Sequence, residues 1–252
     1  MLEVKYEKVT SIEEGVRRLM TVRDEEIPDF TLERRGDGGL CDMLVLSGER
    51  IPLLSWRHEP RMNSMKNYGC RAPEENCAIN TVSFVGKDTS LDALIYRELD
   101  IAEYTLRSKI ESVTAFVNGD ACNLLGKCKS GAMLGLELGA TMAVGTVPQF
   151  NHRIITKHGM ASDRTVNNVV EQSGVYLFAD GDARAIPFDD GEYYLYGLTP
   201  ADGYTAVYIR AIIKGTVDKD ELVRQDEHLR RVLAAVHKSA KSGAREKVSE
   251  VE

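Results

Sequence analysis

The sequence predicts an α+β protein built on an open, largely antiparallel sheet, and three observations lead to this prediction. Apolar residues recur at helical spacing in residues 11–22 and 91–106. Between residues 109 and 187 the pattern changes to short apolar-polar alternations separated by turn signals, which is typical of paired strands. Helical periodicity returns after residue 204. The 252 residues, 43% hydrophobic and 28% charged, have the composition of a globular protein with a sizeable core.

The N-terminal residues predict a short alternation of strands and helices, as in an α/β fragment. Ser11 and Glu14 have the spacing of a capping box, which marks the start of a helix. A glycine-rich turn at residues 36–39 follows that helix. We further expect strands at Val4–Val9 and Ile51–Ser55 and a helix at Leu40–Leu46, which gives the order β-α-β-α-β.

The middle of the chain predicts two helices and then a series of strands. Glu59–Tyr68 and Leu91–Leu106 are expected as helices, with a strand at Asn80–Val85 between them. Asn118-Gly119 between two apolar runs predicts a hairpin with a type I′ turn. Residues 133–142 alternate strictly, which predicts one buried and one open face. With further strands at His152–Thr156, Gly174–Phe178 and Ala183–Pro187, we expect a meander of about five to seven strands.

The C-terminal region predicts two helices. The first spans Tyr204–Lys214. The second spans Asp226–Lys241, with Asp226 as its N-cap and Gly243 just beyond its end.

Charge and composition exclude several classes of function. The net charge of −7 disfavours sequence-independent binding to nucleic acid or to an anionic membrane, because both need a basic surface. The polar N-terminus does not resemble a signal peptide, and no apolar run approaches the roughly 20 residues of a membrane span. We therefore expect a cytoplasmic protein. The five cysteines form no C-x-x-C pair and are expected to be reduced, although Cys70/Cys77 or Cys122/Cys128 would be near enough to pair in an oxidising compartment.

No motif predicts a metal site or a hydrolase. The sequence lacks H-E-x-x-H, the G-x-S-x-G nucleophile elbow and a Walker loop. His152 and His158 are expected as surface or satisfied polar residues. Trp56 is either a core anchor or an aromatic platform beside a sugar. Arg97 either pairs with Glu98 or Asp100 or binds an anionic or hydroxyl-rich ligand.

Several short strings, in order, resemble the Gfo/Idh/MocA family of NAD(P)-dependent sugar and polyol dehydrogenases. The strings are Arg57-His58-Glu59-Pro60-Arg61, Asn80–Phe84, Glu98–Ala102, Leu136–Thr141, Lys157–Met160, and the pair Ala206–Gly215 and Asp226–Gly243. The resemblance implies a C-terminal domain from residue 56 to 252, in which an open sheet carries helices on one face. It also implies that residues 1–55 are a truncated Rossmann-like remnant, because the chain is short for the family.

Three elements of the family's chemistry have no counterpart in the sequence. The G-x-G-x-x-G loop that receives a dinucleotide pyrophosphate is absent. Ile27 stands where the resemblance places the catalytic lysine, and isoleucine cannot move a proton. Arg97 stands where it places the catalytic histidine, and a guanidinium stays protonated and cannot act as a general base.

These differences predict a degenerate dehydrogenase-like protein that is not catalytic and has no cofactor. We expect it to act as an oligomerisation or sugar/polyol-binding subunit. The partner is a second copy joined through the open sheet face, or a full-length dehydrogenase paralogue. The alternative is an oxidoreductase acting on a sugar or polyol with NAD or NADP, in which a partner supplies the nucleotide half. The expected substrate-binding residues are Trp56, Arg57, His58, Tyr96, Arg97 and Asp100.

Overall fold

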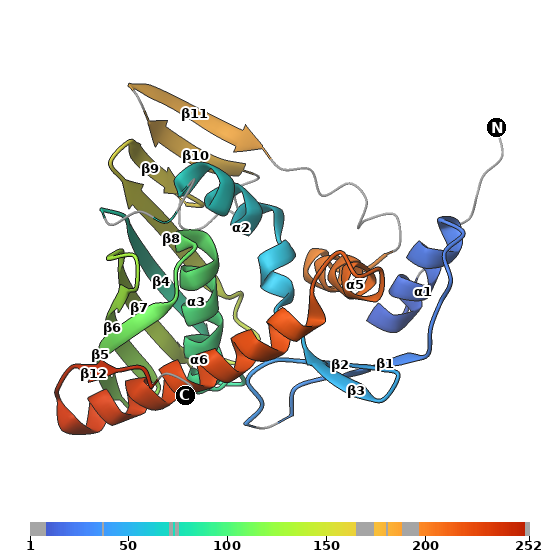
Figure 1. Cartoon of the computed structure of the whole chain (residues 1–252), viewed down its shortest axis with the longest axis horizontal. Coiled ribbons are helices and arrows are strands. Elements are labelled where there is room, and N and C mark those ends of the chain that lie inside the picture. The colour runs from blue at the N-terminus through green and yellow to red at the C-terminus, as the bar shows by residue number, and fades with distance from the viewer. Residues whose placement is uncertain are drawn as a thin grey trace. The chain divides into compact units, whose positions relative to one another are not determined.

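The computed structural model describes residues 9–36, 38–70, 73, 76–164, 174–179, 181–187 and 197–249. The chain divides into two compact units (Figure 1). Unit 1 comprises residues 1–35, 41–59 and 189–225, and unit 2 comprises residues 36–40, 60–188 and 226–252. The expected domain boundary near residue 55 stays a prediction.

Unit 1 combines two helices with a small antiparallel sheet. Helix α1 (Ile12–Val22) starts where the sequence predicts, because the Ser11 hydroxyl accepts a hydrogen bond from the Glu14 amide. Its buried face packs on α5 (Pro200–Ile213), which Thr199 caps. Arg210 of α5 donates to the Glu25 carboxylate just after α1, with 2.7 Å between Nε and Oε2. This ion pair joins segments that are far apart in the sequence.

The sheet of unit 1 corrects the predicted β-α-β-α-β order. Its strands β1 (Phe30–Glu33), β2 (Met43–Leu46) and β3 (Glu49–Pro52) pair antiparallel in chain order. The expected helix at Leu40–Leu46 is therefore wrong. The expected strand at Ile51–Ser55 is shorter than predicted: β3 ends at Pro52, and a 3₁₀ turn, η1 (Ser55–His58), begins three residues later. The expected strand at Val4–Val9 lies largely outside the described residues.

Unit 2 contains a nine-stranded sheet that confirms the predicted fold class. Its strands are β4 (Ala78–Gly86), β5 (Ile110–Asn118), β6 (Ala121–Cys128), β7 (Met133–Met142), β8 (Gln149–Thr156), β9 (Gly159–Ser162), β10 (Gly174–Ala179), β11 (Asp182–Pro187) and β12 (Glu246–Lys247). Their spatial order is β11-β10-β9-β8-β4-β7-β6-β5-β12. Neighbours pair antiparallel except β4 and β7, which are parallel. The sequence did not predict β9, β12 or this parallel pair.

Helices cover one face of this sheet (Figure 1). Helix α3 (Leu91–Leu106) has its predicted bounds and packs on β4, β6 and β7. The later part of α6 (Lys219–Ser242) lies beside α3, where the Tyr96 hydroxyl donates to Asp226 over 2.7 Å. Helix α2 (Pro60–Ser64) and the π-helical turn η2 (Met65–Gly69) occupy the expected segment Glu59–Tyr68 and pack against the part of the sheet around β9 and β10. The inward residues of the alternating strand β7, from Leu134 to Ala140, are buried as predicted.

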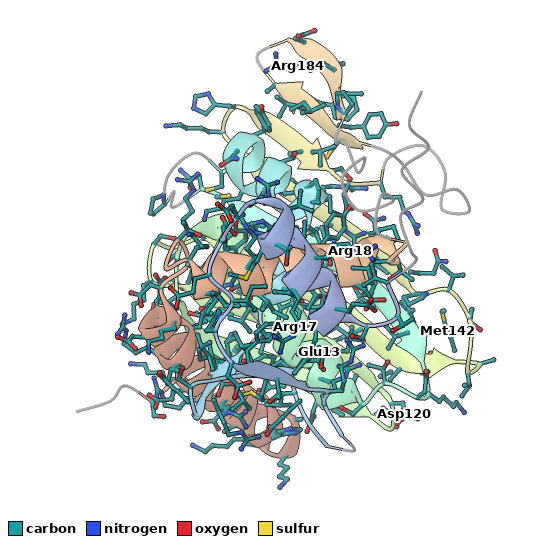
Figure 2. All side chains as sticks on the ribbon, turned by 90° about the vertical axis from the view of Figure 1, so that its right-hand side faces the viewer. Glu13, Arg17, Arg18, Asp120, Met142 and Arg184 are labelled. Atoms are coloured by element: carbon teal, nitrogen blue, oxygen red, sulfur yellow. The ribbon has the colours of Figure 1, made fainter. Side chains whose placement is uncertain are left out.

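Two predicted details differ from the structure, namely the type of the β5–β6 turn and the start of the last long helix. The β5–β6 loop is Gly119-Asp120, and among these two residues only Gly119 has a positive φ, which is the pattern of a type II′ turn and not of type I′. The Asp120 carbonyl of this turn accepts a hydrogen bond from the Ala140 amide near the end of β7 over 2.8 Å. Asp120 and Met142 of β7 are labelled in Figure 2, as is Arg184 on the edge strand β11. Helix α6 begins at Lys219, so Asp226 is inside the helix and is not its N-cap. Gly243 does follow its end, at φ 68°.

Among the described residues, no helix combines the length and the apolar character that a bilayer crossing requires.

Candidate functional site

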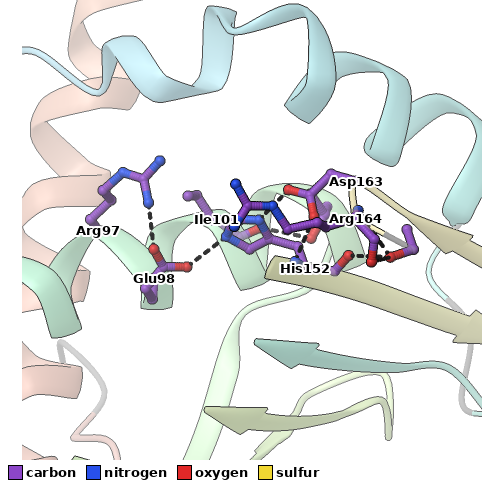
Figure 3. Close-up of polar contacts among 8 residues, drawn as sticks. Arg97, Glu98, Ile101, His152, Asp163 and Arg164 are labelled. Atoms are coloured by element: carbon purple, nitrogen blue, oxygen red, sulfur yellow. Dashed lines mark hydrogen bonds and ion pairs between the residues drawn. The ribbon is translucent and has the colours of Figure 1, made fainter. Parts of the chain in front are cut away.

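A buried cluster of charged side chains lies in unit 2, between α3 and the sheet (Figure 3). Helix α3 supplies Arg97 and Glu98, strand β8 supplies His152, and the residue after β9 supplies Asp163. The strand alternation turns His152 toward the helices, and Thr81 of β4 lies opposite it in the sheet register. Three separate elements therefore place these groups together.

His152 is the centre of the cluster and bonds to a carboxylate on each side. Its Nδ1 lies 2.6 Å from Asp163 Oδ2, and its Nε2 lies 2.9 Å from Glu98 Oε2. The His152 amide also donates to Asp163 Oδ1 over 2.7 Å, which fixes this carboxylate from two directions. Glu98 accepts a further hydrogen bond from the Arg97 guanidinium. His152 and Glu98 are fully buried, so the contacts are shielded from water.

The charges of the cluster stabilise one another. Burial would by itself lower the pKa of His152, but the charges of Asp163 and Glu98 raise it to about 9. Burial would raise the pKa of Glu98, but Arg97 and His152 lower it to about 2. Burial would also raise the pKa of Asp163, but other contacts, above all the charge of His152, lower it. At neutral pH the cluster therefore contains an imidazolium between two carboxylates.

This arrangement is not suited to proton transfer by His152. A general base must be neutral near the working pH and within reach of a substrate proton. His152 is protonated, fully buried and bonded at both ring nitrogens. What the cluster does is fix the position of Arg97, whose side chain is 14% exposed and whose guanidinium carbon lies 4.1 Å from the centre of the Phe150 ring.

The predicted substrate-binding residues divide between the two units. Trp56, Arg57 and His58 lie in turn η1 of unit 1, where the His58 ring lies 5.8 Å from that of Tyr208 and burial lowers its pKa. Their three partners in the prediction, Tyr96, Arg97 and Asp100, lie on α3 of unit 2. Tyr96 and Asp100 are fully buried, and only Arg97 of the three retains some exposure. A single site made of all six residues stays a prediction.

The described residues before residue 60 do not fit a dinucleotide pyrophosphate. Such a site needs a strand, a glycine loop and a helix N-terminus in succession, so that backbone amides face the phosphates. The glycines at 36–39 instead lie in the connection between β1 and β2, where the Gly39 amide closes a turn on the Gly36 carbonyl over 2.9 Å. No step of a reaction is therefore assigned to a bound nucleotide here.

Metal and thiol chemistry receive no support from the described part of the chain. It contains no group of three or more histidine, cysteine, aspartate or glutamate side chains arranged to hold a metal ion. All five cysteines are buried thiols that form no disulfide. Burial raises the pKa of Cys122 to about 11 and that of Cys128 to about 12, so these thiols are poor nucleophiles.

Sequence reasoning did not identify Glu98, His152 and Asp163 as a cluster. The one available signal was Glu98, a charged residue on the predicted buried side of α3, which must find a partner. Of the two partners expected for Arg97, the structure shows Glu98. The expectation of a satisfied polar role holds for His152, which is fully bonded.

Solved structures with a similar fold include a dehydrogenase and other oxidoreductases. Levoglucosan dehydrogenase in its complex with NADH matches with a TM-score of 0.61 and 14% identity, covering 79% of this chain and 65% of that one. An oxidoreductase domain protein from Kribbella flavida gives 0.59 and 15%, with 78% and 66% covered. An NAD-binding oxidoreductase from Klebsiella pneumoniae gives 0.60 and 14%, with 79% and 66% covered.

This likeness concerns the fold, since the identities are low. No protein-family model matches the sequence, and no curated protein matches it. The chain spans slightly less than two thirds of the length of the first dehydrogenases it matches. The match supports the resemblance stated from the sequence at the level of the fold, which this chain shares with these oxidoreductases.

Proposed function

We propose that this protein binds a sugar or polyol on a dehydrogenase scaffold and does not itself transfer hydride. The observation that carries the proposal is the environment of Arg97. It stands at the position that the resemblance gives to the catalytic histidine, and the buried Glu98 carboxylate, itself bonded to His152, holds it in place. An arginine so held is a binding group for hydroxyl or acidic groups and not a base.

The fold neighbours support the choice of a sugar as the ligand class. Levoglucosan dehydrogenase was solved with NADH and levoglucosan and with NADH and L-sorbose. This chain keeps the scaffold, but Ile27 stands at the lysine position and Arg97 at the histidine position. The scaffold can still bind a polyhydroxylated ligand. It lacks the groups that would move the proton from a sugar hydroxyl.

Assembly through the open sheet face is the second part of the proposal. The face of the unit 2 sheet away from α3 carries exposed apolar side chains, among them Phe116 and Leu125 on neighbouring strands. Apolar residues gathered on one face are typical of protein contact surfaces. We propose a second copy of the chain as the partner, with a full-length paralogue as the alternative occupant.

Three assays on the purified chain test the proposal. We expect thermal-shift stabilisation by one or more members of a panel of levoglucosan, L-sorbose, glucose and myo-inositol. We expect no change in NADH or NADPH fluorescence on mixing, and no absorbance change at 340 nm when NAD and sugar are added together. A panel without any stabilising sugar would contradict the binding role. Sugar-dependent reduction of NAD would contradict the non-catalytic role and favour an oxidoreductase.

A further inference from the structure

Two side chains of opposite charge lie on the face of the unit 2 sheet that points away from α3. Glu137 belongs to β7 and Arg153 to β8, and both are exposed. The residues before them, Leu136 and His152, are buried on the helix-covered side, so strand alternation turns the two charges to the open face. Throughout the residues that the structure describes, neither charged group has a hydrogen-bond or ion-pair partner.

The strand order places these two charges on opposite sides of β4. Strand β4 lies between β8 and β7 in the sheet. Its Asn80 pairs with Arg153. Its Val82, two residues further on, pairs with Glu137. Adjacent strands are about 4.8 Å apart, so about 10 Å separates the backbones of β7 and β8. The charges therefore lie at similar distances to either side of β4, and they do not meet within one chain.

Exposed apolar side chains flank the charges on both sides of β4. On the β7 side, Leu125 of β6 and Phe116 of β5 are exposed. On the β8 side, Ile155 of β8 and Phe178 of β10 are exposed. The pairing register places all four on the same face as the charges, because directly paired residues of adjacent strands point the same way. The open face therefore has apolar flanks and one charge of each sign near its middle.

This arrangement of charges and apolar residues is complementary to itself. In a two-fold contact both copies use the same surface, so that residue i meets residue j and j meets i. A two-fold axis that runs along β4, between two stacked sheets, lays β7 of one copy over β8 of the other. Glu137 then faces Arg153 of the second copy, and Arg153 faces Glu137 of that copy. The same axis lays the apolar β5–β6 side of each copy over the apolar β8–β10 side of the other.

The two charges distinguish a second copy from other occupants of this face. Removing a charged group from water is costly unless an opposite charge meets it. A partner that offered only apolar side chains would bury Glu137 and Arg153 without compensation. A second copy related by this axis supplies the opposite charge at both positions. The charges therefore favour a second copy and also set its orientation.

We propose that two copies of the chain stack through the open faces of their unit 2 sheets about a two-fold axis along β4, and that Glu137 of each copy forms an ion pair with Arg153 of the other. This inference rests on the assembly part of the proposed function. It deepens that part, because it selects a second copy over a full-length paralogue and names the charges that orient the contact. Sheets that pack face to face lie about 10 Å apart, which two long side chains pointing toward each other can span.

Reversal of either charge tests the ion pair. Glu137→Arg places two arginines opposite each other at both ends of the contact, and Arg153→Glu places two glutamates there. We expect each single variant to weaken self-association at least about a hundredfold, because like charges that face each other across an interface repel strongly. Sedimentation velocity over a range of micromolar concentrations measures the dissociation constants.

The two changes together are expected to restore the dimer. In the variant that carries both Glu137→Arg and Arg153→Glu, the charges are exchanged, so opposite signs meet again. This rescue requires that position 137 of one copy meets position 153 of the other, and it therefore reports the orientation of the contact. An equimolar mixture of the two single variants should also form dimers, since one copy then contributes two arginines and the other two glutamates.

Glu227→Arg is the matched control. It makes the same change of charge at an exposed position of α6, on the helix-covered side of the sheet (Figure 1). This variant is expected to dimerise as the wild type does. Circular dichroism and thermal melting establish that all variants are folded before their masses are compared.

The outcomes separate this inference from the proposed function. Single variants that dimerise like the wild type would overturn the ion pair and leave assembly through the apolar residues standing. A double variant that stays monomeric would also overturn the ion pair. A monomeric wild-type protein would contradict the assembly together with this inference, whereas sugar binding has its own assay and depends on neither.

Discussion

At the scale of single residues, Arg97 is held by groups that come from distant parts of the chain. Arg97 was found because a family position that should carry histidine carries arginine, which is a comparison along one line of sequence. Its environment depends on His152, which is 54 residues from Glu98, and on Asp163. Contacts over such separations leave no local pattern in a single sequence. The burial of a carboxylate on α3 could be predicted, but its partner could not.

The buried imidazolium predicts a pH dependence of stability. The pKa of His152 is raised to about 9 from about 6.5 in an unfolded chain. Its contribution is therefore fully present below pH 6.5 and is lost as the pH rises through 9. We expect the free energy of unfolding to fall over this interval, and we expect His152→Gln to remove that part of the fall. Urea denaturation at a series of pH values measures both.

The matched control for this variant is His158→Gln, an exposed histidine six positions along the chain. It is expected to keep the wild-type pH profile. At pH 7, His152→Gln should also destabilise the fold by about 3–5 kcal/mol, because two buried carboxylates lose their common cation. A wild-type profile for His152→Gln would mean that the imidazole is neutral in the folded protein.

At the scale of elements, local signals predicted some segments well and others wrongly. Helix α3 has the predicted bounds because its cap and its apolar residues lie within its own sequence. The sequence wrongly predicts a helix at strand β2, because a short apolar run such as Met43–Leu46 is compatible with either structure. Met43–Leu46 is a strand because it pairs with Phe30–Glu33. No local turn signal in Phe30–Glu33 predicts this pairing.

The cap of α3 gives a prediction at this scale. The Ser90 hydroxyl accepts a hydrogen bond from the Ala93 amide over 3.1 Å. We expect Ser90→Ala to lower the free energy of unfolding by about 1 kcal/mol, because an amide of the first turn loses its partner. Ser90→Asp keeps an acceptor at the same place and should remain close to wild type. Equal losses for both variants in urea denaturation would contradict the capping role.

At the scale of the whole molecule, the order of the strands is what the sequence could not supply. Alternation predicted that β7 has a buried and an open face, and the structure confirms this. The chain runs from β4 to its parallel neighbour β7 through α3 and the β5–β6 hairpin, so the paired residues, such as Ala78 and Met133, are about 55 positions apart. The division into two units likewise depends on residues 189–225, which join unit 1 from the far end of the chain.

The open face of the nine-stranded sheet carries the last prediction, which concerns assembly. The side chains of Phe116 and Leu125 are 66% and 61% exposed on this face, and Val82, Met133, Ile155 and Phe178 are exposed as well. We expect a dimer at micromolar concentration, measured by light scattering after gel filtration. Leu125→Glu should shift the mass to that of a monomer, because a charge buried in an apolar contact without a partner is strongly unfavourable.

Val22→Glu is the control for this experiment. Val22 is also 66% exposed and apolar, but it lies at the end of α1 and not on the sheet of unit 2. If any added charge dissociated the dimer, both variants would become monomeric, whereas a contact through the sheet face predicts that only Leu125→Glu does. Both positions are on the surface, so neither variant should lose thermal stability as a monomer. A monomeric wild-type protein would contradict the assembly itself, and a dimer that survives Leu125→Glu would place the contact elsewhere.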